Sequence, residues 1–194
     1  MPTFEIKNRE ITVEKEITEL DQFVLDLLEI LEKYADYVII GGYISIFFGR
    51  SRATEDIDLF IQEITYEEFK SLYDELTQND YELTIANPEK LYNDYLQDEL
   101  SIRIWKTGYP LLNLEMKFAK KPTQKLALKN EITVKFAGKN IKIGDIESQI
   151  AYKRYILKSQ KDLEDARHLE IVFKSIDERK VEAYRKLFED EFKR

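Results

Sequence analysis

The stretch YVIIGGYISIFFGRSRATEDIDLFI, residues 37–61, decides the fold of this chain. Its first four residues are bulky and apolar and predict a short buried strand, which a Gly-Gly pair ends. A short helix and a polar loop are expected over 43–55. Charged and aliphatic residues then alternate over 56–61, which is typical of a half-buried strand. A strand, a glycine turn, a helix and a second strand in this order predict a mixed α/β core.

The second strand carries two acids at alternate positions, Asp56 and Asp58. Side chains two residues apart on a strand point to the same face, so the residues between and after them turn toward the core. Neighbouring carboxylates repel each other unless a cation lies between them, and Mg²⁺ prefers carboxylate and phosphate oxygens. Taken alone, two acids on a solvated strand face are the ordinary alternative. The pair is therefore a candidate metal site that depends on its surroundings.

Those surroundings favour phosphate binding. Gly41 and Gly42 lie between a strand and a helix, where a phosphate can approach the backbone and meet the amide groups of a helix N-terminus. Arg52 and Thr54 supply a cation and a hydroxyl just before the acids. A tight turn and a polar loop would explain each feature separately. Together they predict a phosphate site beside the metal site.

Residues 39–42 and 52–59, with the sequences IIGG and RATEDIDL, resemble the signature of the DNA polymerase beta-like nucleotidyltransferase superfamily. The arginine and threonine before the acids are similar to the AbiEii-like branch, many of whose members are toxins of toxin–antitoxin systems. The resemblance implies a nucleotidyltransferase fold of the α/β (α+β) class: a mixed β-sheet flanked by helices, with a helical tail. It also implies an enzyme that uses Mg²⁺ or Mn²⁺ to transfer a nucleoside monophosphate from a triphosphate such as ATP.

The same resemblance implies the partners. The acceptor hydroxyl would belong to a tRNA 3′ end or to a protein, and a toxin would have an antitoxin protein as its partner. A small-molecule acceptor such as an antibiotic is one alternative. Another is a non-catalytic nucleotide-binding or protein-interaction module that keeps the fold.

A third carboxylate is expected on a later strand, and Glu115 is the best candidate. Asn113, Glu115 and Lys117 share one face of the strand expected over 111–119. The resemblance thus implies Asp56, Asp58 and Glu115 as catalytic and metal-binding residues, although the superfamily more often has Asp at the third position. A surface Glu on an edge strand is the alternative. Arg103, on the preceding strand, would face either the same cleft or solvent.

The C-terminal part carries a second set of charged residues. Lys153 falls on the apolar stripe of a predicted helix, so its ammonium group needs an anionic partner or an opening to solvent. Lys153, Lys161, Asp162 and Asp165 resemble the "Lys … Arg … Lys-Asp-x-x-Asp" tail of AbiEii-like enzymes, with Lys158 where the family tends to have Arg. The resemblance implies that the lysines line the triphosphate side and that the acids orient them. Ordinary ion pairing along the helix is the alternative.

The composition excludes several classes of binding site. The chain has 194 residues, 43% of them hydrophobic, which is enough for a sizeable core. A net charge of −8 argues against a broad phosphate-backbone footprint. With no cysteine and one histidine, His168, thiolate and multi-histidine metal sites are excluded. The start has no signal-peptide pattern and no apolar run reaches the length of a membrane span, so the cytoplasm is expected.

The remaining pattern divides the chain into a core with an N-terminal helix, residues 1–143, and a helical subdomain, residues 144–194. Strands or a short hairpin are expected over 1–15. Further helices are predicted over 16–35, 65–79, 88–99, 123–129 and from Asp145 to the end, with caps at Asp145 and Ser159. Further strands are predicted over 81–86, 100–106, 111–119, 131–136 and 140–143, with a turn at Gly108-Tyr109-Pro110.

Overall fold

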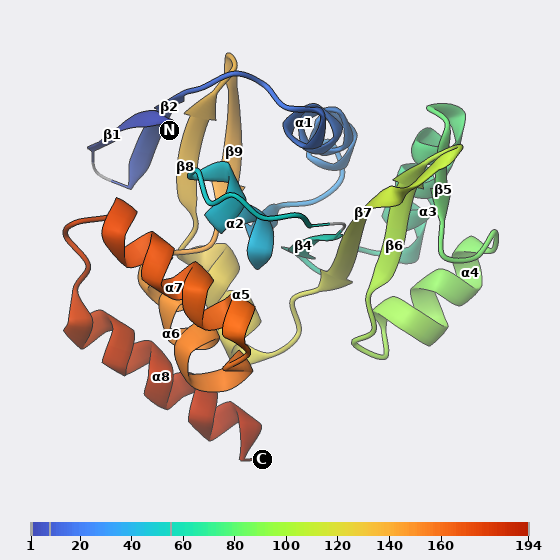
Figure 1. Ribbon diagram of the computed structural model, residues 1–194. Helices are drawn as coiled ribbons and strands as arrows, with labels where there is room; N and C mark the ends of the chain where they lie inside the picture. Colours follow the sequence, from blue (N-terminus) through green and yellow to red (C-terminus); the bar gives the residue numbers. More distant parts are fainter. Residues whose placement is uncertain (1, 8, 55, 194) are drawn as a thin grey trace.

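The computed structural model describes residues 2–7, 9–54 and 56–193, and Figure 1 shows its ribbon. The strands are β1 (Thr3–Lys7), β2 (Glu10–Glu14), β3 (Tyr37–Ile40), β4 (Asp56–Ile61), β5 (Tyr81–Leu83), β6 (Ile102–Lys106), β7 (Tyr109–Phe118), β8 (Ile132–Phe136) and β9 (Lys139–Ile143). The α-helices are α1 (Glu19–Leu31), α2 (Gly42–Phe47), α3 (Tyr66–Gln78), α4 (Pro88–Lys90), α5 (Pro122–Lys129), α6 (Ile146–Ala151), α7 (Gln160–Val172) and α8 (Glu178–Phe192). Two π-helical segments are η1 (Leu91–Leu96) and η2 (Tyr152–Leu157).

The described strands form one nine-stranded mixed sheet in the order β1-β2-β8-β9-β3-β4-β7-β6-β5. The mixed α/β fold with flanking helices is therefore confirmed. Parts of two predicted segments lie outside the described residues. They are residues 1 and 8 of the N-terminal hairpin and residue 55 of the polar loop.

The central strands place the two aspartates as the alternation predicts. β4 runs antiparallel to β3 and parallel to β7, so Asp58 lies beside Ile40 on one side and Glu115 on the other. Ile57 and Leu59 are buried in the core, whereas Asp56 and Asp58 are half-buried on the opposite face. Apolar side chains on one face thus anchor the strand, and the acids occupy the other.

Side-chain caps fix where the long helices begin, and α1 and α3 each begin after a threonine. Thr18 and Asp21 form a capping box at the start of α1, and Thr65 and Glu68 form another at the start of α3. Each box satisfies backbone N–H groups that the first helical turn leaves free. The helix predicted over 16–35 therefore begins after Thr18. Asp145 and Ser159 cap α6 and α7 as predicted.

The structure corrects the predicted turn between β6 and β7. Gly108 has the left-handed φ of 82°, and the chain reverses at residues 107–108. Tyr109 pairs with Lys106 in the hairpin register, so Tyr109 and Pro110 belong to β7.

The helices α6, α7 and α8 gather below the sheet in the view of Figure 1. The predicted boundary falls between the end of β9 at Ile143 and the start of α6 at Ile146. The division into two domains and the cytoplasmic location stay predictions. None of the helices in the described ranges combines the length and the apolar character needed to cross a bilayer.

Candidate active site

The carboxylate of Asp58 lies directly against the glycine turn. Gly41 has φ 78° and ψ −147°, a conformation open almost only to glycine. A Cβ atom at this position would overlap Oδ2 of Asp58. The sequence predicts that the aspartates and the Gly-Gly corner meet, and the backbone of Gly41 does meet Asp58. Glycine is required here both for its φ angle and for the space that the carboxylate takes.

The other two acids are each held by a neighbour on the sheet. Asn113 lies opposite Asp56, and its side-chain amide donates to Asp56 Oδ1 over 2.8 Å. Arg103 lies opposite Glu115, and its Nε donates to Glu115 Oε1 over 2.7 Å. The hydroxyl of Ser101 donates to the second oxygen of Glu115 over 3.3 Å. Arg103 therefore faces the same side of the sheet as Glu115.

Burial and neighbouring negative charge act together on Asp58. Burial, followed by repulsion from Glu115 and Asp56, raises the pKa of Asp58 to about 6. A cation at this point would relieve that repulsion, and the hard oxygen donors fit Mg²⁺. Asp56 and Asp58 are the residues that would hold it.

Glu115 is turned toward Arg103 and Ser101. Within residues 2–7, 9–54 and 56–193, no three acidic or histidine side chains converge as a complete metal centre. A direct metal contact of Glu115 stays a prediction.

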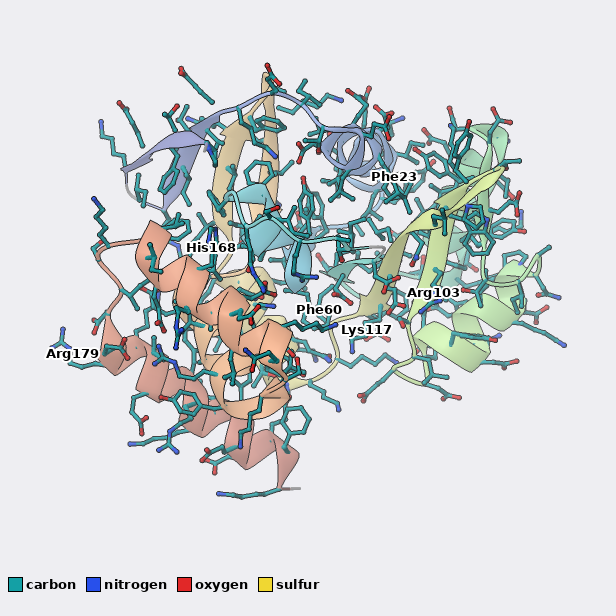
Figure 2. The ribbon with its side chains drawn as sticks, in the orientation of Figure 1. Phe23, Phe60, Arg103, Lys117, His168 and Arg179 are labelled. Carbon is teal, nitrogen blue, oxygen red and sulfur yellow. The ribbon has the colours of Figure 1, made fainter. Side chains whose placement is uncertain are left out.

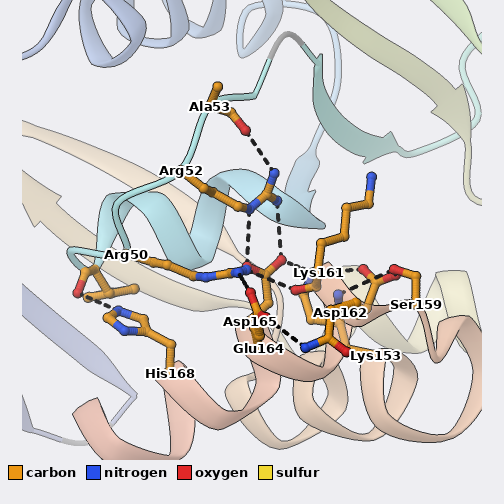
Figure 3. Close-up of polar contacts among 12 residues, drawn as sticks. Arg50, Arg52, Ala53, Lys153, Ser159, Lys161, Asp162, Glu164, Asp165 and His168 are labelled. Atoms are coloured by element: carbon orange, nitrogen blue, oxygen red, sulfur yellow. Dashed lines mark hydrogen bonds and ion pairs between the residues drawn. The ribbon is translucent and has the colours of Figure 1, made fainter.

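A buried ion cluster joins η2, α7 and the loop before β4 (Figure 3). Lys153 is only 2% exposed, and its Nζ lies 2.9 Å from Oδ2 of Asp165 and 3.7 Å from Oδ1 of Asp162. The lysine on the apolar stripe thus has the anionic partners that its burial requires. Burial lowers the pKa of Lys153 to about 8, although Asp162 acts in the opposite direction. The two aspartates therefore fix the position of the ammonium group, while its burial lowers its pKa.

Asp165 also binds both arginines of the loop before β4. Arg52 donates from Nε to Oδ1 over 3.1 Å and from Nη2 to Oδ2 over 3.2 Å. Arg50 pairs with the same carboxylate and donates to the backbone carbonyl of Lys161 over 2.8 Å. A Cβ atom on Gly42 would overlap the guanidinium of Arg52. One fully buried carboxylate therefore places three cations beside the glycine turn.

The remaining predicted residues lie around this cluster. The hydroxyl of Thr54 donates to the backbone carbonyl of Asp56 over 3.0 Å, which holds the end of the loop onto β4. Ser159 caps α7 and contacts Asp162. The side chain of Lys161 is exposed and points away from the ion cluster in Figure 3, and its ammonium group pairs with no acid of the described residues. His168 contacts the carbonyl of Phe48 over 3.1 Å, which is a packing role.

A cavity of about 480 Å³ extends from the glycine turn and the acids of the sheet to the C-terminal helix. Gly41, Asp58, Glu115 and Lys153 line one part of it, and side chains of α5, η2 and α8 line the rest. Figure 2 shows Phe60 and Lys117, which also line the cavity, between the sheet and the C-terminal helices. Acids, a lysine and a glycine backbone thus open into one space of the size that small ligands occupy.

The structure adds residues that sequence reasoning missed. Gln149 accepts a hydrogen bond from the N–H of Gly41 over 2.9 Å and lines the cavity. It lies four residues before Lys153, and this spacing on one helical face was the available signal. The other lining residues that the sequence did not single out for this site include Tyr184, Phe188 and Phe192. These three recur every fourth residue along α8.

Comparison with known proteins gives structural matches only. No family model and no curated protein sequence matches the chain. The antibiotic-resistance factor ANT(2'')-Ia, in its complex with adenylyl-2''-tobramycin, is 17% identical with a TM-score of 0.54 over 88% of this chain and 97% of that chain. The lincosamide antibiotic adenylyltransferase LnuA, bound to lincomycin, is 14% identical with a TM-score of 0.53 over 81% of this chain and 99% of that chain.

A third similar structure is an antigenic nucleotidyltransferase-like protein from Paracoccidioides brasiliensis. It is 16% identical, with a TM-score of 0.50 over 79% of this chain and 74% of that chain. These likenesses establish a nucleotidyltransferase-like fold, as the sequence predicts. The AbiEii-like branch stays a prediction.

Proposed function

We propose that the chain is a Mg²⁺-dependent nucleotidyltransferase that transfers a nucleoside monophosphate from a nucleoside triphosphate to an acceptor hydroxyl. One observation carries the proposal. Asp58 lies against the backbone of Gly41, in a cavity that Glu115 and Lys153 also line. This arrangement puts carboxylates that suit a divalent ion, a glycine turn and a buried cation around one space.

Each predicted residue has a role in this reaction. Asp56 and Asp58 would hold the metal ion, which when bound neutralises phosphate charge and acidifies a nearby hydroxyl. Glu115 would contribute to a second metal position. Gly41 and Gly42 would seat the phosphates, and their lack of Cβ atoms leaves room beside them for the Asp58 carboxylate and the Arg52 guanidinium. Lys153 and Arg52 would offset the charge of the polyphosphate, and the exposed Lys161 would add a further cation. Asp162 and Asp165 orient these cations, and Thr54 holds the start of β4.

In the transfer step, the acceptor oxygen forms a bond to the α-phosphorus while the bond from that phosphorus to the β-phosphate oxygen breaks. Pyrophosphate leaves, and the proton of the hydroxyl passes to solvent. The attacking and leaving oxygens lie roughly in line in such reactions. Asp58 and Lys153 supply fixed charges of opposite sign at the cavity wall, which is the kind of preorganisation that lowers the barrier.

The acceptor follows from the AbiEii-like resemblance: a tRNA 3′ end or a protein hydroxyl, with an antitoxin as the partner of a toxin. A small-molecule hydroxyl is the second candidate. It is favoured by two structures of similar fold, one holding adenylyl-2''-tobramycin and one bound to lincomycin.

The test is incubation with each of the four α-labelled triphosphates, Mg²⁺ and a panel of acceptors: tRNA, purified proteins, tobramycin and lincomycin. The expected result is label and a nucleoside-monophosphate mass shift on one acceptor class. Asp58→Asn should abolish the shift, whereas Asp98→Asn, which changes an exposed aspartate away from the cavity, should not. Equal transfer by the Asp58→Asn variant would overturn the proposal.

A further inference from the structure

We propose that the aromatic part of the cavity, formed by Tyr152, Tyr184, Phe188 and Phe192, binds the nucleobase of the donor triphosphate. The inference rests on the proposed function and names the group that this part of the cavity receives. It concerns residues of η2 and α8 that contact neither the acids nor the ion cluster in the described hydrogen bonds and ion pairs.

The helix α8 directs an aromatic face into the cavity. Residues four apart lie on the same side of a helix, so Tyr184, Phe188 and Phe192 face together toward η2. The ring of Tyr152 lies 5.1 Å from that of Phe188 and 6.3 Å from that of Phe192, centroid to centroid. Leu126 and Ala127 of α5 complete an apolar wall. A flat, apolar group is the ligand that such a wall fits.

The side chain of Phe192 leaves part of the aromatic wall accessible to a ligand. It lines the cavity and is nevertheless 59% exposed. Its ring therefore keeps an open face at the edge of a site whose other end is charged. Large exposed aromatics beside a pocket mark binding surfaces, and an aromatic ring stacks on any base because every base has a π-face.

The chemistry of the whole cavity matches a nucleotide. Lys153 at the phosphate end and Tyr152 at the aromatic end are consecutive residues, and both line the same space of about 480 Å³. A nucleoside triphosphate likewise has a planar ring at one end and a polyphosphate at the other. The volume lies in the range of small-ligand sites. The aromatic end thus continues the phosphate site.

A contact between α8 and α5 keeps the wall in place. Glu191 accepts hydrogen bonds from the N–H of Thr123 over 3.1 Å and from its hydroxyl over 2.6 Å. Glu191 is the lining carboxylate of α8, and these bonds already engage both of its oxygens. These bonds fix α8 against α5, so the aromatic side chains of α8 keep their place at the cavity.

Calorimetric titration separates base binding from phosphate binding. The four Mg²⁺–nucleoside triphosphates and Mg²⁺–tripolyphosphate are titrated into the wild-type protein and the Phe192→Ala variant. Loss of one stacking ring should weaken the preferred triphosphate roughly tenfold, because removing such a ring weakens base binding from about fivefold to more than a hundredfold. Tripolyphosphate affinity should stay within about twofold. Leu187→Ala, which removes a 46% exposed side chain of α8 outside the cavity lining, is the matched control.

Phe188→Leu is the second variant, because it keeps the apolar volume and removes the aromatic face. It should weaken the triphosphate and leave tripolyphosphate unchanged. Unchanged triphosphate affinity in both variants, or an equal loss for tripolyphosphate, would overturn the inference while leaving nucleotidyl transfer intact. A higher KM for the acceptor with normal triphosphate affinity would assign the wall to the acceptor instead. Failure of the wild-type protein to bind any triphosphate would overturn the proposed function as well.

Discussion

Asp58→Asn should make the protein more stable while it removes transfer. The pKa of Asp58 rises from 3.8 to about 6, first through burial and then through repulsion from Glu115 and Asp56. An acid whose pKa is higher in the folded state costs stability as pH rises from the unfolded value through the folded one, and the full cost is present above pH 6. This difference between the folded and unfolded pKa of Asp58 lowers the free energy of unfolding by about 3 kcal/mol at pH 7.5. The neutral amide should recover part of it, on the order of 1–3 kcal/mol.

The assay is urea unfolding of both proteins at pH 7.5 and at pH 3.5, in a buffer that contains a chelator so that no divalent ion offsets the charge. The variant should be the more stable at pH 7.5. The difference should nearly vanish at pH 3.5, where Asp58 is largely protonated in both states.

In parallel, transfer should fall by at least about 10²–10³-fold, the usual loss when a preorganised charged group is removed. A variant that is less stable at pH 7.5, or one that retains wild-type transfer, would refute the reasoning. The first result would show that Asp58 is favourably placed for folding, and the second that its charge has no part in the reaction.

Three further predictions concern the surrounding structure. Gly41→Ala should lose about 1–3 kcal/mol of unfolding free energy in urea, because alanine is strained at φ 78° and its Cβ overlaps Asp58; an unchanged urea midpoint would contradict this. Asp165→Asn should lower the free energy of unfolding in urea by about 3–5 kcal/mol, because it leaves Lys153 and two arginines without their buried carboxylate. The double variant Asp165→Asn/Lys153→Met should recover part of this loss, because it also removes the buried ammonium group. Burial opposes ionisation of Asp21, but hydrogen bonds from Lys15 and from the capping residue of α1 outweigh it and lower the pKa of Asp21. The wild-type protein should therefore lose stability as pH falls below about 4, and Asp21→Asn should flatten that part of the urea-midpoint profile.

Much of the fold could be predicted from local pattern. The strands β3 and β4 begin and end where the apolar run and the charge alternation place them. Both strands are short and bounded by glycine or polar residues, so few other structures are compatible with them. The turn before β7 was wrong by two residues, because hairpin pairing between strands places Tyr109 in β7.

The candidate site could be predicted only in part. The acids, the glycine pair and Lys153 are visible as motifs because their spacing is local or resembles a known family. The partners of these residues are not: Gln149 bonds to Gly41 across 108 residues, and Arg52 reaches Asp165 across 113. No sequence period predicts contacts between residues so far apart along the chain.

Periodicity and steric restriction alone established that Asp56 and Asp58 share one face of a strand and that a glycine turn follows a buried strand. Both are properties of a few adjacent residues. Folding of the whole chain determined which groups surround that face: Arg103 on Glu115, three cations on Asp165, and the aromatic face of α8 across the cavity. The contacts of α7 and α8 form because burial packs α7 against α2 and α8 against α5. A charge that is removed from water then pairs with whichever group the packed chain places beside it.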